Sequence, residues 1–278
     1  MIKIVTDSTV DLSKDTINEL GITIVPLSTT VDGVSYVDGI DLTSEGFMKL
    51  MATANELPKT SQPPVGKFVE VFDELGKDGS EILAINLTSK MSGTHNSAVA
   101  ASNISESKVT CWNSQYISHA MSYQIREAVE MAKKGFSVEA ILERLDKVRE
   151  CTSLFIVVDR LENLVKGGRV SKSMGFLGSI LNIKPIASLS GGEYTPVAKV
   201  RNYSQVIKFL AKQFAEDIKG KTIKYVGIAH ADGLEHANNL CEAIKDYVKK
   251  EQIYIHHTCS TISSHTGPGA ISFTYMVE

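Results

Sequence analysis

Short apolar runs alternate with segments of helical periodicity along the chain, and this alternation limits the possible folds more than any other feature. Strands are predicted at residues 2–5, 23–27, 82–86 and 109–112. Apolar residues at three- and four-residue spacing predict helices at residues 11–20, 44–51, 65–75, 94–102 and 116–134. Strands that alternate with helices in this way favour a mostly parallel sheet with helices on both faces.

A second composition begins near residue 150, after a helical stretch that runs from Tyr116 to Arg149. The elements predicted beyond it are strands at residues 153–158, 225–229, 254–257 and 271–277, helices at 161–165, 173–181, 203–217 and 234–249, and a hairpin of 184–189 with 193–199. The 278 residues, 43% of them hydrophobic, provide material for two cores. We therefore predict two α/β domains, residues 1–150 and 151–278, each a mostly parallel sheet flanked by helices, with a ligand in the interdomain cleft.

Charge and composition exclude several classes of protein. The 29 basic and 32 acidic residues give a net charge of -3 without a basic tract, which argues against nucleic-acid binding. No apolar stretch approaches the roughly 20 residues that cross a bilayer, so a soluble, cytoplasmic protein without a transmembrane segment is expected. The four cysteines form no CxxC pair, and no GxSxG or HExxH motif occurs, so we predict reduced thiols, no metal, no cofactor and no catalytic residue.

Two segments place small hydroxyl residues directly before predicted helices. Thr60 and Ser61 precede two prolines, and the Ser92-Gly93-Thr94 segment follows the strand at residues 82–86. Free N–H groups at a helix start bind anions, and loops at the carboxyl end of a parallel strand commonly hold ligands. Ordinary capping of the following helix explains the same residues equally well.

Two glycine-containing segments lie in the second half. Residues 166–171 set a glycine pair between Lys166 and Arg169 without the spacing of a P-loop, which favours a structural or partner-contact role. His265 lies in a small-residue loop at residues 263–270 that offers no apolar neighbours to bury it. An exposed imidazole titrates near neutral pH and donates to a carboxylate or relays a proton, but a lone histidine is also commonly structural.

Taken in order, these segments resemble the DegV family of fatty-acid-binding proteins. The resemblance covers nearly the whole chain and rests on residues 7–9, 60–63, 92–94, 167–169, 201 and 265–269. It implies a two-domain DegV-like fold that holds one long-chain fatty acid, such as palmitate, between the domains. It also implies a binding subunit of a bacterial fatty-acid kinase, whose partner kinase converts the bound acid to an acyl phosphate for phospholipid synthesis. A transient contact with a membrane surface is compatible with this role.

The resemblance assigns roles to individual residues. Thr60, Ser92 and His265 would hold the carboxylate, since a carboxylate accepts several charge-assisted hydrogen bonds. The neighbours placed with them are Ser61, Gly93, Thr94, Thr266 and Gly267. Arg201 matches the position associated with the kinase, where it would act in docking or near the transferred phosphate. Pro64 departs from the pattern, since a small residue would serve equally well there.

The acyl chain requires an apolar tunnel. Burial of about sixteen carbons at roughly 0.8 kcal/mol per methylene supplies ample gross affinity, most of which an exposed tail would forfeit. Apolar residues at helix and strand spacing are also ordinary core residues. The predicted lining residues are Phe155, Ile156, Met174, Leu177, Ile180 and Phe273.

Two other functions remain open from the sequence. The chain could be a stand-alone enzyme that acts on an acyl or phosphate substrate through Ser92 and His265, although no nucleotide motif supports a kinase. It could also be a regulatory protein in which the polar loops only cap helices. A fatty acid that copurifies with the chain would distinguish the carrier from both.

Overall fold

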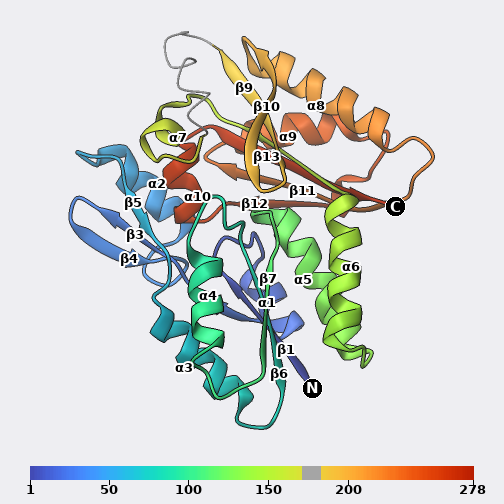
Figure 1. The fold of residues 1–278 in the computed structure, drawn as a ribbon. Coiled ribbons are helices and arrows are strands. Elements are labelled where there is room, and N and C mark those ends of the chain that lie inside the picture. Colours follow the sequence, from blue (N-terminus) through green and yellow to red (C-terminus); the bar gives the residue numbers. More distant parts are fainter. Residues whose placement is uncertain (171–182) are drawn as a thin grey trace.

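The first half of the chain is built on a parallel sheet, as predicted. The computed structural model describes residues 1–170 and 183–278, and its first sheet has the order β2–β1–β6–β7 (Figure 1). The strands are β1 (Ile2–Asp7), β2 (Thr23–Val25), β6 (Glu81–Asn86) and β7 (Val109–Asn113). The surrounding helices are α1 (Lys14–Leu20), α3 (Val65–Gly76), α4 (Thr94–Ser102), α5 (Ser118–Lys133) and α6 (Val138–Glu150). Gly135, in the left-handed region at φ 80°, separates α5 from α6.

Alternate residues of these strands face opposite layers, because successive side chains of a strand point to opposite sides. Val5 and Ile82 pack with Phe68 of α3 in one buried cluster. Ile4 and Leu83 belong to a second cluster that includes residues of α5. The sheet is therefore buried on both faces, as the continuous apolar runs indicate.

A small antiparallel sheet, which the sequence pattern does not predict, adjoins this domain. Its order is β4–β3–β5, with β3 (Ser28–Val31), β4 (Val34–Val37) and β5 (Lys59–Ser61), and α2 (Ser44–Thr53) connects β4 to β5. Strands of three or four residues rich in Thr and Ser are too short to show an apolar alternation. This sheet positions Thr60, which pairs with Thr29 of β3.

The second half has a six-stranded sheet, and the expectation that it is mostly parallel is wrong. The order is β10–β9–β8–β13–β11–β12, and only β11 and β12 are paired in parallel among these strands. The strands are β8 (Thr152–Val157), β9 (Lys184–Ser190), β10 (Glu193–Val200), β11 (Ile223–Ala231), β12 (Ile253–His257) and β13 (Ala270–Val277). The last strand, β13, inserts between β8 and β11 and runs antiparallel to both, a pairing that no local pattern encodes.

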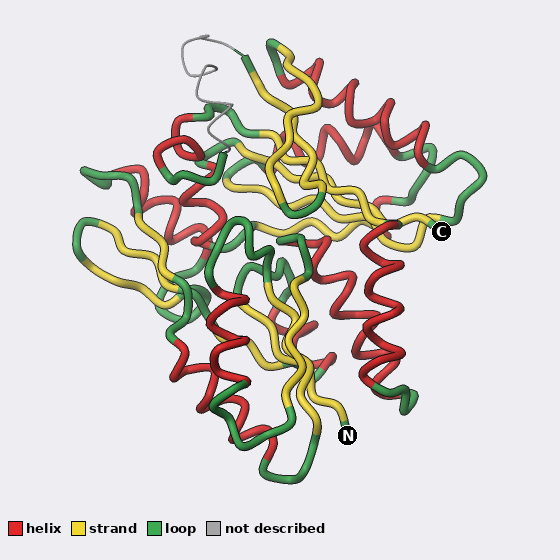
Figure 2. The backbone as a smooth tube through the Cα atoms, in the orientation of Figure 1, coloured by secondary structure: helices red, strands yellow, loops and turns green. Residues whose placement is uncertain are grey.

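Helices cover this sheet and complete the second half. They are α7 (Glu162–Lys166), α8 (Tyr203–Asp217), α9 (Leu234–Ile244), a 3-10 turn (Lys250–Gln252) and α10 (Ser260–Thr266). The helix predicted at residues 173–181 lies outside the described residues. Helix α10 covers residues 263–266 of the segment expected to be a loop, and it contacts α2, β3 and β5 of the first half as well as α7 (Figures 1 and 2). Its buried side chains are mostly Ser and Thr, so no apolar period marks it.

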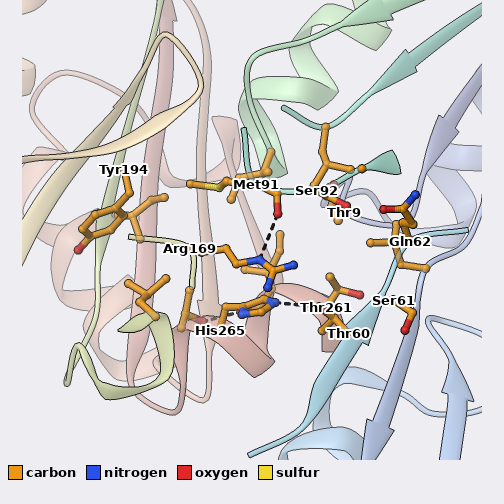
Figure 3. A pocket seen from close by; sticks show the side chains of 18 residues that line it. Thr9, Thr60, Ser61, Gln62, Met91, Ser92, Arg169, Tyr194, Thr261 and His265 are labelled. Carbon is orange, nitrogen blue, oxygen red and sulfur yellow. Dashed lines mark hydrogen bonds between the residues drawn. The ribbon is translucent and has the colours of Figure 1, made fainter. Parts of the chain in front are cut away.

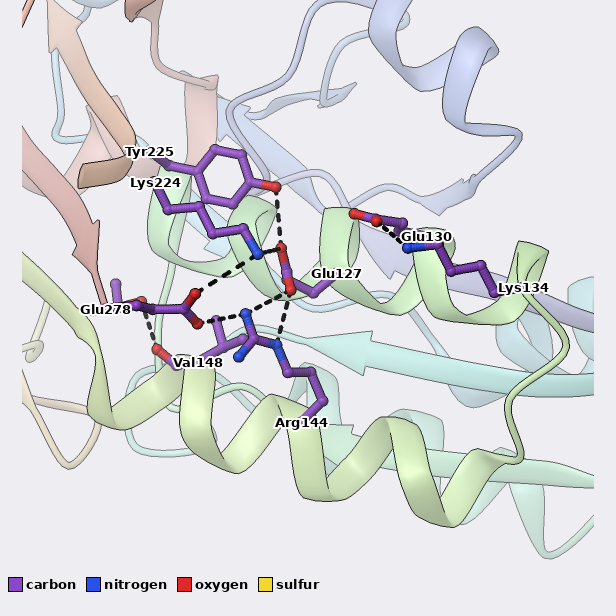
Figure 4. Close-up of polar contacts among 9 residues, drawn as sticks. Glu127, Glu130, Lys134, Arg144, Val148, Lys224, Tyr225 and Glu278 are labelled. Atoms are coloured by element: carbon purple, nitrogen blue, oxygen red, sulfur yellow. Dashed lines mark hydrogen bonds and ion pairs between the residues drawn. The ribbon is translucent and has the colours of Figure 1, made fainter. Parts of the chain in front are cut away.

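The two halves share a hydrophobic core and a polar cluster. Leu83 and Ile85 of β6 lie in the same apolar cluster as Leu154 and Ile156 of β8. Figure 4 shows the polar cluster, in which Glu127 of α5 is joined to Arg144 of α6 and to Lys224 and Tyr225 of β11. The predicted domain boundary at residue 150 falls between α6 and β8.

Three expectations from composition concern the described residues. All four cysteines are free thiols, although of these only Cys241 is buried and the other three are partly buried. Residues 1–170 and 183–278 contain no group of three or more His, Cys, Asp or Glu placed to hold a metal ion. The helices of the same residues are too short or too polar to cross a membrane.

Candidate functional site

A cavity of about 310 Å³ lies where the two halves meet. Its walls combine a polar group of residues with an apolar group, as Figure 3 shows. The polar lining residues are Thr9, Thr60, Ser61, Gln62, Ser92, Arg169, Tyr194, Thr261, His265 and Thr266. The apolar lining residues are Leu27, Leu87, Met91, Ile117, Ile156, Leu164 and Ile262, with Gly93 beside them. The volume lies at the lower end of the range of small-molecule sites.

Thr60 and His265 meet across the junction of the two halves. Thr60 Oγ1 on β5 and His265 Nε2 in the last turn of α10 are 2.8 Å apart and hydrogen-bonded. Burial, and then the nearby charge of Arg169, lower the pKa of His265 to about 4. The expectation that His265 is exposed is therefore wrong. Its imidazole is partly buried and is neutral at neutral pH.

The size of Gly167 makes room for this imidazole. A Cβ atom at Gly167 would lie 2.4 Å from Nδ1 of His265 and 2.9 Å from the backbone oxygen of Asn163. Both distances are shorter than real Cβ contacts, so any larger residue would displace the ring or the end of α7. Gly167 thus has a packing function at the site.

The Ser92 loop is held against the segment that follows Thr60. Ser92 Oγ lies 2.9 Å from Thr94 Oγ1 and accepts a hydrogen bond from the Thr94 backbone N–H. A Cβ atom at Gly93 would lie 2.0 Å from Oε1 of Gln62, so a larger residue at this position would displace the Gln62 side chain. Thr94 is fully buried and supports Ser92 without lining the cavity.

Arg169 is a site residue that the sequence interpretation missed. Its Nε donates to the backbone oxygen of Met91 at 3.1 Å and its Nη1 donates to that of Gly167 at 2.5 Å. Figure 3 shows the guanidinium next to the His265 ring. Burial lowers the pKa of Arg169 below its ordinary value, and the group stays cationic. The glycine pair followed by Arg169 is the sequence signal for this site, but because the spacing is not that of a P-loop, it indicates a structural or partner-contact role.

The predicted acyl-lining residues separate into three groups. Ile156 lines the cavity. Phe155 and Phe273 are paired across β8 and β13 and point to the other face of the sheet, into the cluster that contains Phe214 of α8. Met174, Leu177 and Ile180 lie outside the described residues.

Two further predicted residues lie away from the cavity. Arg201 is exposed directly after β10, where its backbone N–H donates to Oε1 of Gln205. Gly267 ends α10 at φ 74° beside Asn163 and does not line the cavity. Thr266, by contrast, does line it.

Comparison with protein-family models matches the whole chain, residues 1–278, to "uncharacterised protein, DegV family". The chain belongs to the DegV family. A DegV domain-containing protein of Staphylococcus aureus (strain N315) is 41% identical over 273 residues, which cover 98% of this chain and 98% of the relative. The family resemblance seen in the sequence is therefore confirmed.

Solved DegV structures share the fold of this chain. A DegV family protein from Thermus thermophilus, described by its fatty-acid binding, superposes with a TM-score of 0.91 at 30% identity and covers 100% of this chain and 99% of its own. DegV from Bacillus subtilis, described as a fatty-acid-binding protein, gives a TM-score of 0.90 at 30% identity with the same coverage. Fatty-acid binding is thus a property described for DegV relatives of the same fold.

Proposed function

We propose that this protein binds one long-chain fatty acid in the 310 Å³ cavity, with the carboxylate at Thr60, Ser92 and His265. The observation that carries the proposal is the meeting of Thr60 and His265, beside the cation of Arg169, at the wall of a cavity that also has seven apolar lining residues. Hydroxyls, a neutral imidazole that donates one N–H and a cation suit a carboxylate. The fatty-acid binding described for the Thermus thermophilus and Bacillus subtilis relatives supports the same ligand.

The role of the apolar walls follows from the hydrophobic effect. Each methylene that leaves water contributes about 0.8 kcal/mol. Leu87, Met91, Ile156 and Leu164 offer side chains for such contacts, and Ser61 and Thr266 lie with the polar residues. The ligand then spans the junction of the two halves.

We further propose that the protein presents the carboxylate to a partner kinase, which forms an acyl phosphate for phospholipid synthesis, and performs no catalysis itself. The family resemblance supports this step. The competing stand-alone enzyme needs Ser92 and His265 to act together, but Ser92 is hydrogen-bonded to Thr94 and His265 to Thr60, and no hydrogen bond joins Ser92 to His265. A nucleophile and its base are normally within hydrogen-bond reach.

Mass spectrometry of the purified protein tests the binding function. We expect one fatty acid per chain, and an affinity about 100-fold lower in the Thr60→Ala/Ser92→Ala variant, because hydrogen bonds to a charged group are worth about 1.5–3 kcal/mol each. Thr53→Ala/Thr195→Ala removes two exposed hydroxyls and serves as the matched control. A protein that carries no fatty acid, and still takes up none after incubation with a range of acids, would rule the proposal out.

Substitution of Arg169 tests whether its charge acts on the ligand. Arg169→Met should weaken the binding of palmitate by about tenfold or more, because a partly buried charge interaction is lost. Binding of hexadecanol, which has no carboxylate, should change much less. Equal losses for the acid and the alcohol would instead assign Arg169 to holding the Met91 and Gly167 segments in place.

Substitution of Arg201 tests the binding of the fatty acid separately from its phosphorylation by the partner kinase. Because Arg201 is exposed and does not line the cavity, Arg201→Ala should leave the fatty-acid content of the protein unchanged. In the presence of the partner kinase and ATP, we expect this variant to form acyl phosphate about tenfold more slowly, because one charged contact at the interface with the kinase is lost. A normal rate with Arg201→Ala would show that this residue takes no part in the kinase step. Lys199→Ala, which removes an exposed cation near the end of the preceding strand β10, is the control.

A further inference from the structure

A second cavity of about 520 Å³ lies in the first half of the molecule, against β12. It is enclosed by the segment that follows β1, by α1, by the connection from β4 to α2, and by the end of β12. It shares no lining residue with the 310 Å³ cavity proposed to hold the fatty acid (the fatty-acid cavity), and its volume is typical of a small-molecule site. The lining residues are Ser8, Val10, Asp11, Leu12, Lys14, Ile17, Ile24, Pro26, residues 38–44, His256, His257 and Cys259.

Two buried carboxylates form part of its wall. Asp11 is 4% exposed and Asp38 is 6% exposed, and because both line the cavity, their remaining accessible surface faces it. Asp11 accepts hydrogen bonds from the hydroxyls of Ser118 and Thr258. These partners are uncharged.

Asp38 has the same kind of surroundings. Its carboxylate accepts from Ser8 Oγ at 2.9 Å and from the backbone N–H and hydroxyl of Ser260 at 3.1 and 2.7 Å. Within residues 1–170 and 183–278, neither Asp38 nor Asp11 forms an ion pair with a Lys, Arg or His side chain. Lys14 lies at the cavity wall and is not paired with either of them.

The carboxyl groups of Asp11 and Asp38 have no countercharge among the described residues, and burial raises the pKa of Asp11 to about 7, so Asp11 is only partly ionised at neutral pH. Buried charges in proteins are normally paired or bound to a cation, because their removal from water is unfavourable. The described residues supply no metal cluster for this purpose, and the cavity is much larger than a metal ion needs. An organic cation that enters the cavity would supply the missing charge.

The remaining walls fit the rest of such a ligand. Ile17, Ile24 and Leu42 provide apolar surface, and Ile40, which is 72% exposed, marks where the cavity reaches solvent. The His256 ring also lines the cavity and makes no hydrogen bond to a described residue, although its Nδ1 is inaccessible. Its second nitrogen is therefore available to a polar group of the ligand.

We propose that this cavity binds a small organic cation, a primary amine with an apolar body, through Asp11 and Asp38. The ammonium group contacts the two carboxylates, and the apolar body lies against Ile17, Ile24 and Leu42. This site is separate from the fatty-acid cavity, so the proposal does not depend on the proposed function.

Calorimetric titration of the palmitate-saturated protein with hexylamine, and with hexan-1-ol as the uncharged isostere, tests the charge requirement. We expect saturable binding of the amine that is at least about tenfold tighter than that of the alcohol. Amide and methyl chemical shifts should change at Ile24, Leu42 and His256 and not at Leu164 of the fatty-acid cavity. No saturable binding up to about 10 mM amine, equal binding of the alcohol, or shifts at Leu164 alone would each overturn the proposal.

Substitutions of Ile40, at the exposed edge of this cavity, test the proposal without removing a buried side chain that the fold needs. Ile40→Lys brings a positive charge to the cavity and should weaken the amine by about tenfold, whereas Ile40→Gln should stay within about twofold of the original protein. Asp38→Asn should weaken amine binding by a similar factor. Asp15→Asn, which removes an exposed carboxylate of α1, is the control for the change in net charge. Equal amine binding by Ile40→Lys and Ile40→Gln would overturn the proposal even if Asp38→Asn does not fold.

Discussion

Phe273→Ala is expected to lower the free energy of unfolding by about 4 kcal/mol and to leave the fatty-acid affinity of the folded protein unchanged. Phe273 is fully buried, and its ring packs edge-on against Phe214 at 5.4 Å and tilted against Tyr275 at 5.1 Å. Removal of a buried ring loses its transfer free energy and leaves a void between β13 and α8. This void lies on the side of the sheet that faces away from the fatty-acid cavity.

Ile156→Ala, in the neighbouring strand β8, should affect ligand binding as well as stability, because Ile156 is buried in the core that the two halves share. Ile156 lines the fatty-acid cavity, so its truncation should weaken the binding of palmitate by about tenfold through lost methylene contacts. Urea denaturation and palmitate titration of both variants give the comparison. If the Phe273→Ala protein is folded but binds palmitate weakly, the acyl chain contacts the Phe273 face of the sheet and not the Ile156 face, which would contradict the proposed site.

Glu127→Ala is expected to lower the free energy of unfolding by about 3 kcal/mol. Glu127 is 5% exposed, and its carboxylate is bound by Arg144 at 2.8 Å, Lys224 Nζ at 2.8 Å and Tyr225 OH at 3.1 Å (Figure 4). Without it, two cations remain beside each other in a partly buried position. This loss of about 3 kcal/mol is at the lower end for a broken buried ion pair. In the variant, Arg144 and Lys224 still form ion pairs with Glu278 and are partly exposed to solvent.

The control lies on the same helix. Glu130 pairs with Lys134 in solvent, with the Glu130 side chain 54% exposed, so Glu130→Ala should cost less than about 1 kcal/mol. Urea denaturation at neutral pH measures both variants. Equal effects at Glu127 and Glu130 would show that the Glu127 cluster does not hold the two halves together.

The same cluster predicts an acid response. Burial raises the pKa of Glu127, but the bonds from Lys224 and Arg144 outweigh burial and hold the pKa below its ordinary value of 4.5. A carboxyl with a depressed folded pKa contributes stability above its unfolded pKa and loses it as the pH falls through the folded pKa. The Glu127 contribution should therefore be complete at neutral pH and be lost as the pH falls below 4.5 and through the lower folded pKa.

The strand and helix order could be predicted from local patterns, but the partners of strands could not. β1, β6 and β7 are apolar runs of five or six residues and are evident in the sequence. The position of β13 between β8 and β11 is a long-range pairing, so the sequence pattern allowed a parallel sheet where the molecule has a mostly antiparallel one. Helix α10 was missed because its buried face consists of Ser and Thr.

The candidate site shows the same limit at the level of single residues. Thr60, Ser92 and His265 could be named because they lie in segments whose order resembles a family. The choice between Phe155 and Ile156 could not be made, because β8 is buried on both faces and both residues are apolar. Arg169 was missed because its function depends on contacts with the Met91 segment, 78 positions away in the chain.

Helix α10 has a consequence for how the molecule should respond to its lipid supply. The helix brings His265 of the second half to Thr60 of the first, so a ligand held by both residues also fastens the halves to each other. A ligand that binds only the folded state raises its stability, by about 2.7 kcal/mol when the free ligand is present at 100 times its dissociation constant. If the protein binds a fatty acid as proposed, its melting temperature should therefore rise with fatty-acid concentration, and protein without bound fatty acid should be more sensitive to heat and to proteases.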